Sequence, residues 1–229
     1  MVGKFAIASN DFVIVKAYFI SGLGADSKAF YKLKLPAHFE CVYLDWLTPL
    51  DGESLRQYAQ RFSGLIKEDE NFILIGLSLG GMIASEIARI KNPRKVIILS
   101  SISVSDEMPW YFRFAGKIGM QKAIPVSVYK NFTILNLFMG SASKADKAML
   151  LSFVKQTDPL FIRWAVDAIL GWNQRERLDD IVHIHGNKDN LLPIKYTKAS
   201  HVINNGRHLM VLNKAKEINS VLQQVLSAQ

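Results

Sequence analysis

The stretch FILIGLSLGG, residues 72–81, joins a continuous apolar run to a serine enclosed by glycines. The run FILIGL (72–77) predicts a buried strand, and GMIASEIARI (81–90) has apolar residues at helical spacing. Ser78 therefore occupies a strand-to-helix corner between the small residues Gly76 and Gly80. Such a corner strains the serine backbone and exposes its hydroxyl beside the N–H groups that begin the helix. The pattern favours a nucleophile, and a serine that merely caps a helix is the alternative.

Other apolar runs rich in β-branched and aromatic residues surround this stretch. They predict strands at 12–21, 41–46, 95–101 and 181–186, with a weaker strand at 200–205. Apolar residues at helical spacing predict helices at 54–68 and 81–91 and along the C-terminal residues 211–225. Strands that alternate with helices predict a doubly wound α/β fold with a mainly parallel sheet.

Residues 104–178 interrupt this alternation, because they contain no convincing strand. Ser143 and Asp146 form a capping-box pattern, and a second helix is predicted from Asp158-Pro159 to Gly171. We therefore predict a core made of residues 1–103 and 179–229, with a helical cap inserted at 104–178.

A serine nucleophile needs a base, and the base needs an acid that orients it. Asp189 follows the strand at 181–186, and His208 follows the last predicted strand. Loops that follow parallel strands meet at one edge of the sheet, so Ser78, Asp189 and His208 are expected to lie together. Asp106, beside Glu107, is the other plausible acid. Its place five residues past a strand suggests a solvated start to the insertion, so Asp189 is preferred.

Four segments in this order resemble the α/β-hydrolase family: FISGLGAD (19–26), GLSLGG (76–81), HGNKDNLLP (185–193) and NGRHLMV (205–211). The resemblance runs from about Tyr18 to the C-terminus. It departs from the common pattern at Ser21-Gly22, where relatives often carry His-Gly. Some of the family's leading strands are expected to be missing or confined to residues 2–9.

The resemblance implies specific roles. Ser78 would be the nucleophile, His208 the general base and then acid, and Asp189 the orienting acid. The backbone N–H groups of Leu79 and Leu23 would form the oxyanion hole, with Gly24 as the alternative to Leu23. The resemblance also places the helical cap over the active site.

The implied activity is that of a serine hydrolase acting on carboxylic esters or thioesters through an acyl-enzyme. The same residues on this fold also support carbon–carbon bond hydrolysis, lyase chemistry and perhydrolysis, and a non-catalytic ligand-binding protein is a further alternative. Aromatic residues of the cap favour a pocket for small to medium apolar substrates. The aromatics considered are Trp110, Tyr111, Phe112, Phe114, Phe132, Phe138, Trp164 and Trp172, most of which are expected to be ordinary packing residues.

Several other function classes are not favoured. The net charge of +8 comes from scattered Lys and Arg without a nucleic-acid-binding motif, so no nucleic-acid partner is expected. No glycine-rich phosphate loop is visible, so no cofactor is expected. His183 and His185 share a strand face, but a third metal ligand is missing and the resemblance gives His185 a structural role, so no metal is expected.

The chain has one cysteine, Cys41, and no apolar run of the ~18–20 residues that a membrane span needs. We expect a cytoplasmic protein with no membrane span and a small-molecule ester or thioester substrate. The sequence leaves the oligomeric state open.

Overall fold

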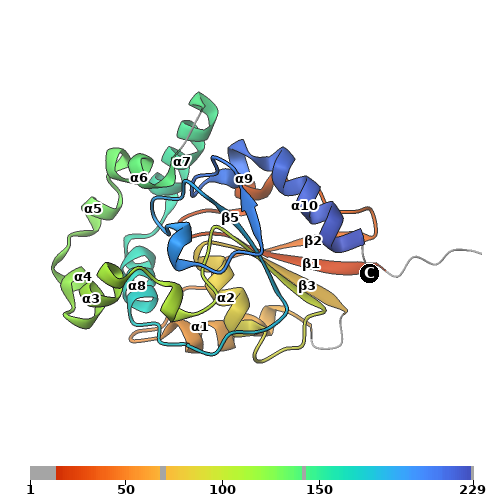
Figure 1. Cartoon of the computed structure of the whole chain (residues 1–229). Coiled ribbons are helices and arrows are strands. Elements are labelled where there is room, and N and C mark those ends of the chain that lie inside the picture. Colours follow the sequence, from red (N-terminus) through yellow and green to blue (C-terminus); the bar gives the residue numbers. More distant parts are fainter. Residues whose placement is uncertain (1–13, 68–70, 141–142, 228–229) are drawn as a thin grey trace, which may run out of the picture.

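The computed structural model describes residues 14–67, 71–140 and 143–227. Its six-stranded sheet has the order β2-β1-β3-β4-β5-β6, and each neighbouring pair is parallel (Figure 1). The strands are β1 (Val15–Ile20), β2 (Phe39–Leu44), β3 (Phe72–Leu77), β4 (Lys95–Leu99), β5 (Ile181–Gly186) and β6 (His201–Ile203). The predicted α/β fold with a parallel sheet is confirmed, including the weak last strand. Residues 2–9 and the first two residues of the strand predicted at 12–21 lie outside the described residues.

Helices cover both faces of the sheet (Figure 1). Helices α1 (Leu55–Phe62) and α2 (Leu79–Ile87) pack on one face, while α9 (Met210–Asn213) and α10 (Ala215–Ser227) pack on the other. In β3, Ile73 and Ile75 enter the core under α9 and α10, and Leu74 enters the core under α1 and α2. A strand buried on both faces has no polar side to show, which explains the continuous apolar run FILIGL.

The strand order places a crevice beside β1. The chain runs from β1 outward to β2 and then returns to add β3 on the other side of β1. In open parallel sheets, ligands bind where the strand order reverses, outside the carboxyl ends of the strands. The segments that leave β1 and β3, beginning at Ser21 and Ser78, flank this point.

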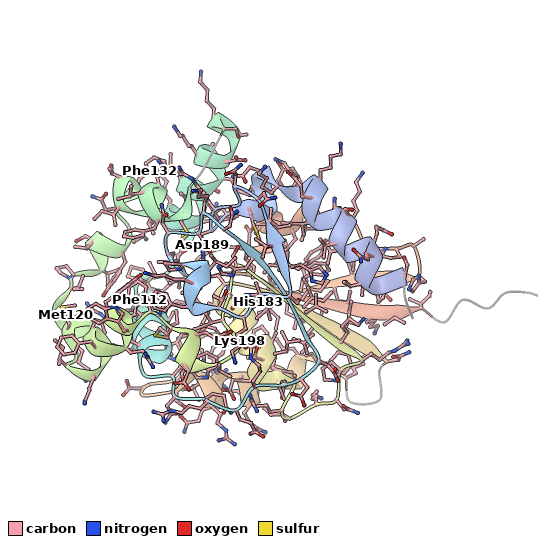
Figure 2. All side chains as sticks on the ribbon, in the orientation of Figure 1. Phe112, Met120, Phe132, His183, Asp189 and Lys198 are labelled. Atoms are coloured by element: carbon pink, nitrogen blue, oxygen red, sulfur yellow. The ribbon has the colours of Figure 1, made fainter. Side chains whose placement is uncertain are left out.

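Six helices lie between β4 and β5 in the described chain and group beyond one end of the sheet (Figure 1). They are α3 (Trp110–Lys117), α4 (Met120–Ala123), α5 (Val126–Tyr129), α6 (Phe132–Met139), α7 (Lys144–Gln156) and α8 (Pro159–Leu170). The capping box of Ser143 with Asp146 starts α7, and Asp158 caps α8, which stops before Gly171, as predicted. In Figure 2, Phe112, Met120 and Phe132 lie on this cap side of the molecule. The limits 104 and 178 of a separate cap stay a prediction.

Two tryptophans attach the cap to the core. The indole Nε1–H of Trp164 donates to the carbonyl of Glu53 at 2.7 Å, just before α1. The indole Nε1–H of Trp172 donates to the side chain of Glu86, on α2, at 2.6 Å. The end of the cap is thus tied to both helices on one face of the sheet.

The side chain of Glu107 joins segments at the start and end of the cap. This buried carboxylate accepts from the Ser103 N–H at 2.7 Å and the Lys198 N–H at 2.8 Å, and it pairs with Arg177. Ser103 precedes the cap, Arg177 follows α8, and Lys198 belongs to the segment between β5 and β6, so one carboxylate joins three separate segments. Within the described ranges, no helix is both long and apolar enough to cross a membrane.

Candidate active site

Ser78 lies at the corner where β3 turns directly into α2. Its φ of 51° and ψ of −118° are strained for a residue that carries a Cβ. The corner needs glycine on both sides. A Cβ on Gly80 would lie 2.1 Å from the carbonyl oxygen of Ile20, and one on Gly76 would lie 2.3 Å from that of Gly80. The sequence pattern around Ser78 is therefore a steric requirement of this corner.

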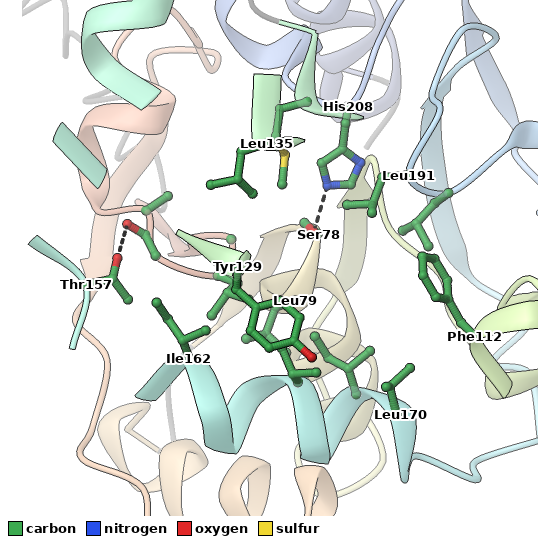
Figure 3. Close-up of a pocket in the computed structure, with 18 of the residues that line it drawn as sticks. Ser78, Leu79, Phe112, Tyr129, Leu135, Thr157, Ile162, Leu170, Leu191 and His208 are labelled. Atoms are coloured by element: carbon green, nitrogen blue, oxygen red, sulfur yellow. Dashed lines mark hydrogen bonds between the residues drawn. The ribbon is translucent and has the colours of Figure 1, made fainter. Parts of the chain in front are cut away.

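His208 and Asp189 extend from Ser78 as a hydrogen-bonded series. The Nε2 of His208 lies 2.9 Å from the Ser78 Oγ (Figure 3), and its Nδ1 lies 2.8 Å from the Asp189 Oδ2. A carboxylate only accepts, so the Nδ1–H of His208 donates to Asp189, which leaves Nε2 to accept from the Ser78 hydroxyl. Both side chains are buried. The structure thus brings together the three residues proposed from the sequence, in the geometry of an activated serine.

Asp189 is held in its ionised form. Its Oδ1 accepts the N–H groups of Leu191 and Leu192, each at 2.9 Å. Burial raises the pKa of the Asp189 carboxyl. The charge and hydrogen bond of His208, with the N–H of Leu192, more than offset burial, so this pKa lies below its ordinary value. An ionised, fixed carboxylate can orient His208 and stabilise it when it becomes charged.

Asp106, the other acid considered, has different surroundings. Its side chain is 54% exposed and pairs with Arg113 at 3.6 Å and Arg175 at 3.8 Å. It makes no contact with His208 among the described residues. Its position fits the solvated start of the insertion, whereas the neighbouring Glu107, expected to share that setting, is buried.

The loop after β1 lies directly against the serine. A Cβ on Gly22 would lie 3.4 Å from that of Ser78. The Ala25 N–H donates to the Gly22 carbonyl at 2.9 Å, and the Ser21 hydroxyl donates to the Ala25 carbonyl at 2.7 Å. These bonds close residues 21–25 into a turn beside Ser78.

The N–H groups of Leu79, Leu23 and Gly24 donate no hydrogen bond to another residue within the described part of the chain. All three residues line the same cavity as Ser78. Three backbone N–H groups without a partner in the described chain thus belong to residues that lie beside Ser78.

Thr157, which follows α7, brings its hydroxyl close to this loop. The Thr157 Oγ1 lies 3.1 Å from the Gly24 carbonyl oxygen and 2.5 Å from that of Phe153 (Figure 3). Gly24 has a φ of +75°, and a Cβ there would lie 2.7 Å from the same hydroxyl oxygen. Sequence reasoning missed Thr157, because no local signal marks a contact between segments so far apart in the chain.

A cavity of about 350 Å³ opens between Ser78 and the cap. Its walls are almost entirely apolar and mostly aliphatic (Figure 3). Lining residues include Met82, Ile102, Leu135, Ile162, Leu170 and Leu191. Of the eight cap aromatics considered, Phe112 lines the cavity. The side chains of Trp110 and Phe114 are exposed to solvent. Those of Trp164 and Trp172 belong to the hydrophobic core. The pocket is apolar mainly because of aliphatic side chains, which the sequence pattern did not single out.

His183 and His185 lie on one face of β5, as expected from their spacing, and their rings bond to each other, with Nε2 of His183 3.1 Å from Nδ1 of His185. Among the described residues, no group of three or more His, Cys, Asp or Glu side chains could hold a metal ion.

Comparison with known proteins places this chain in a family. The model of the alpha/beta hydrolase family matches residues 17–221, which is most of the chain. The chain belongs to the alpha/beta hydrolase family. No curated protein matches the sequence.

Solved structures share the alpha/beta hydrolase fold at low identity. A lipase-esterase related protein from Clostridium acetobutylicum ATCC 824 has a TM-score of 0.66 at 18% identity, with 91% of this chain and 93% of that chain covered. A thermophilic esterase from Thermogutta terrifontis has a TM-score of 0.70 at 12% identity, with 93% and 90% covered. An esterase from Exiguobacterium antarcticum has a TM-score of 0.68 at 14% identity, with 91% and 90% covered.

Proposed function

We propose that this alpha/beta hydrolase is a serine hydrolase that cleaves carboxylic esters or thioesters of small to medium apolar substrates. The observation that carries the proposal is the hydrogen-bonded series Ser78, His208 and Asp189, opening onto an apolar cavity of about 350 Å³. An activated serine beside unused N–H donors is the arrangement that acyl transfer requires.

In the proposed reaction, the Ser78 Oγ attacks the substrate carbonyl carbon while the Nε2 of His208 takes the hydroxyl proton. The N–H groups of Leu79 and Leu23, or of Gly24 in the alternative register, donate to the oxyanion of the tetrahedral intermediate. Loss of one such donor costs about 3–4 kcal/mol of transition-state stabilisation. Asp189 stays ionised and stabilises the charged His208.

The proton then passes from His208 to the departing alcohol or thiol as the bond to the carbonyl carbon breaks. The acyl group remains on Ser78. His208 next takes a proton from water, whose oxygen attacks the acyl carbon, and then returns that proton to Ser78 Oγ as the carboxylic acid leaves. Every step uses side chains and backbone groups described above.

The cavity favours uncharged substrates. Its volume is near the lower end of the ~300–1,000 Å³ typical of small-molecule sites, and its walls are apolar. The charged lining residue Lys130 directs its Nζ to the Thr157 carbonyl at 2.9 Å. We expect uncharged esters with short to medium acyl chains to react faster than strongly charged ones. A preference for dianionic substrates that salt weakens would contradict this part of the proposal.

The test combines covalent labelling with a substrate panel. A fluorophosphonate probe should label wild-type protein and Ser27→Ala, an exposed-serine control, but not Ser78→Ala. On p-nitrophenyl esters of increasing chain length and on acyl-CoA thioesters, Ser78→Ala should be about a thousand-fold or more slower than wild type. A folded wild-type protein that takes no label and turns over none of these substrates would reject the proposal.

We further propose a cytoplasmic location, because a chain with the single cysteine Cys41 has no internal disulfide that would need an oxidising compartment.

A further inference from the structure

Two fully buried imidazoles, those of His183 and His185, lie beside Asp189. The His185 Nε2 is 2.7 Å from the Leu192 carbonyl oxygen and 3.4 Å from the Asp189 Oδ2. The Nε2 of His183 is 3.1 Å from the Nδ1 of His185. Neither ring plays a part in the reaction steps above. Figure 2 shows His183 and Asp189 in the core, on the same side of the cap helices.

The partners of these rings fix their tautomers. A carbonyl oxygen only accepts, so the Nε2 of His185 carries its proton. The Nδ1 of a neutral His185 is then an acceptor, so the Nε2 of His183 donates to it. Burial, followed by the nearby His185 and Arg177, lowers the pKa of His183 to about 3, and burial lowers the pKa of His185 below its ordinary value. Both rings are therefore neutral near pH 7.

His185 supports the loop that binds Asp189. It holds the carbonyl of Leu192, whose N–H donates to the Oδ1 of Asp189. Its Nε2 also lies 3.4 Å from the Oδ2 of Asp189, the oxygen that accepts from His208, but its single N–H is used by the Leu192 carbonyl. Loss of this N–H would free the Leu192 carbonyl and so loosen the loop that fixes the Oδ1 of Asp189.

We propose that His185 is a positioning residue that aligns Asp189 with His208, and that His183 holds His185 in the required tautomer. The inference rests on the proposed hydrolase function, because its consequence is a correctly oriented His208. It assigns a series of neighbouring groups that runs from His183 through His185, Asp189 and His208 to Ser78.

A matched pair of variants isolates the N–H at Nε2. The amide nitrogen of His185→Gln can occupy the place of the imidazole Nε2, whereas that of His185→Asn lies near the place of Nδ1. His185→Gln should keep kcat within about threefold of wild type. His185→Asn should lose about 10- to 100-fold in kcat with little change in KM, because the reacting groups are misaligned. The acid limb of its kcat/KM profile should move to lower pH, because the charged His208 is less stabilised.

The same two substitutions, Gln and Asn, at His183 test whether His183 fixes the tautomer of His185. His183→Gln keeps a donor toward His185 and should resemble wild type, whereas His183→Asn should reproduce part of the His185→Asn defect. In the His185→Gln background, the acceptor at Nδ1 is gone, so His183→Asn should add little. This non-additivity would show that His183 acts through His185.

A measurement that needs no turnover separates this inference from the proposed function. The Nδ1–H of His208 should give a low-field proton NMR resonance, assigned by its loss in His208→Gln. That resonance should shift in His185→Asn and stay near the wild-type position in His185→Gln. Near-UV circular dichroism checks that each variant is folded.

An unshifted resonance and a wild-type pH profile in His185→Asn would overturn the inference. Equal losses in His185→Gln and His185→Asn would also overturn it, since they would indicate ring shape in place of the Nε2–H. If wild-type protein is neither labelled at Ser78 nor active, the hydrolase proposal fails instead, and the NMR shift still decides the role of His185.

Discussion

The carboxylates of Asp189 and Asp106 both follow strands of the sheet, but their surroundings differ sharply. Asp189 is buried against His208, and Asp106 is half exposed between two arginines. We predict that Asp189→Asn lowers kcat about 10³- to 10⁴-fold, because the amide favours the wrong tautomer of the imidazole. Asp106→Asn should stay within about twofold of wild type. Steady-state kinetics on the best ester measures both, and the reverse pattern would move the orienting role to Asp106.

The buried His183 makes the free energy of unfolding depend on pH, and the direction follows from its pKa. Its pKa is about 3 in the folded chain, held down by burial, His185 and Arg177, against an ordinary value of 6.5. Between these values the unfolded chain binds the additional proton, so the free energy of unfolding falls as pH falls. From pH 6.5 to 4.5 the wild type should lose roughly 2 kcal/mol more than His183→Gln. Urea unfolding at both pH values tests this, and equal losses would contradict it.

The sequence allowed the positions of Ser78, Asp189 and His208 to be predicted because each carries a local mark. Ser78 has its glycines, and the other two follow predicted strands. Glu107 has no such mark. It was expected beside Asp106 in a solvated setting, yet it is buried, because Arg177 and Lys198 reach it from distant parts of the chain. Partners that only the fold brings together leave no pattern in neighbouring residues.

Among the elements, strands were easier to predict than cap helices. Buried strands such as β3 and β5 show as continuous apolar runs, and α7 and α8 start with side-chain caps. Helices α3 to α6 were not predicted individually. They have four to eight residues, and α3, α4 and α5 lack a side-chain cap. Helices this short depend on tertiary packing and leave a weak periodic signal.

At the end of α7, the Thr157 hydroxyl contacts the loop after β1. Thr157→Val keeps the shape of the side chain but removes the hydroxyl that lies near the Gly24 carbonyl. Loss of a hydrogen bond costs about 1 kcal/mol of stability. Because the loop carrying Leu23 would then be held less firmly, kcat should fall by about two- to fivefold. Thr157→Ser keeps the hydroxyl and should be close to wild type. A wild-type kcat in Thr157→Val would show that the loop is held without this contact.

At the scale of the whole molecule, the cap shares both hydrophobic cores with the sheet. Phe161 and Trp164 of α8 join the core under α1 and α2, and Leu150 and Phe153 of α7 join the core under α9 and α10. We predict that cap and sheet unfold together. Trp164→Phe, which loses the hydrogen bond to Glu53, should shift the near-UV and far-UV thermal transitions by the same amount. Two separate transitions would indicate a cap that folds on its own.

The outer cap differs from this shared core. Helices α5 and α6 contain no buried residue, although Tyr129, Leu135 and Met139 line the cavity. Few buried contacts mean a small free energy of local unfolding. Native-state hydrogen exchange should therefore be faster at the amides of α5 and α6 than at those of β3 or α2. Bulky substrates would then reach Ser78 through transient opening of these two short helices, with the sheet and the inner cap remaining folded.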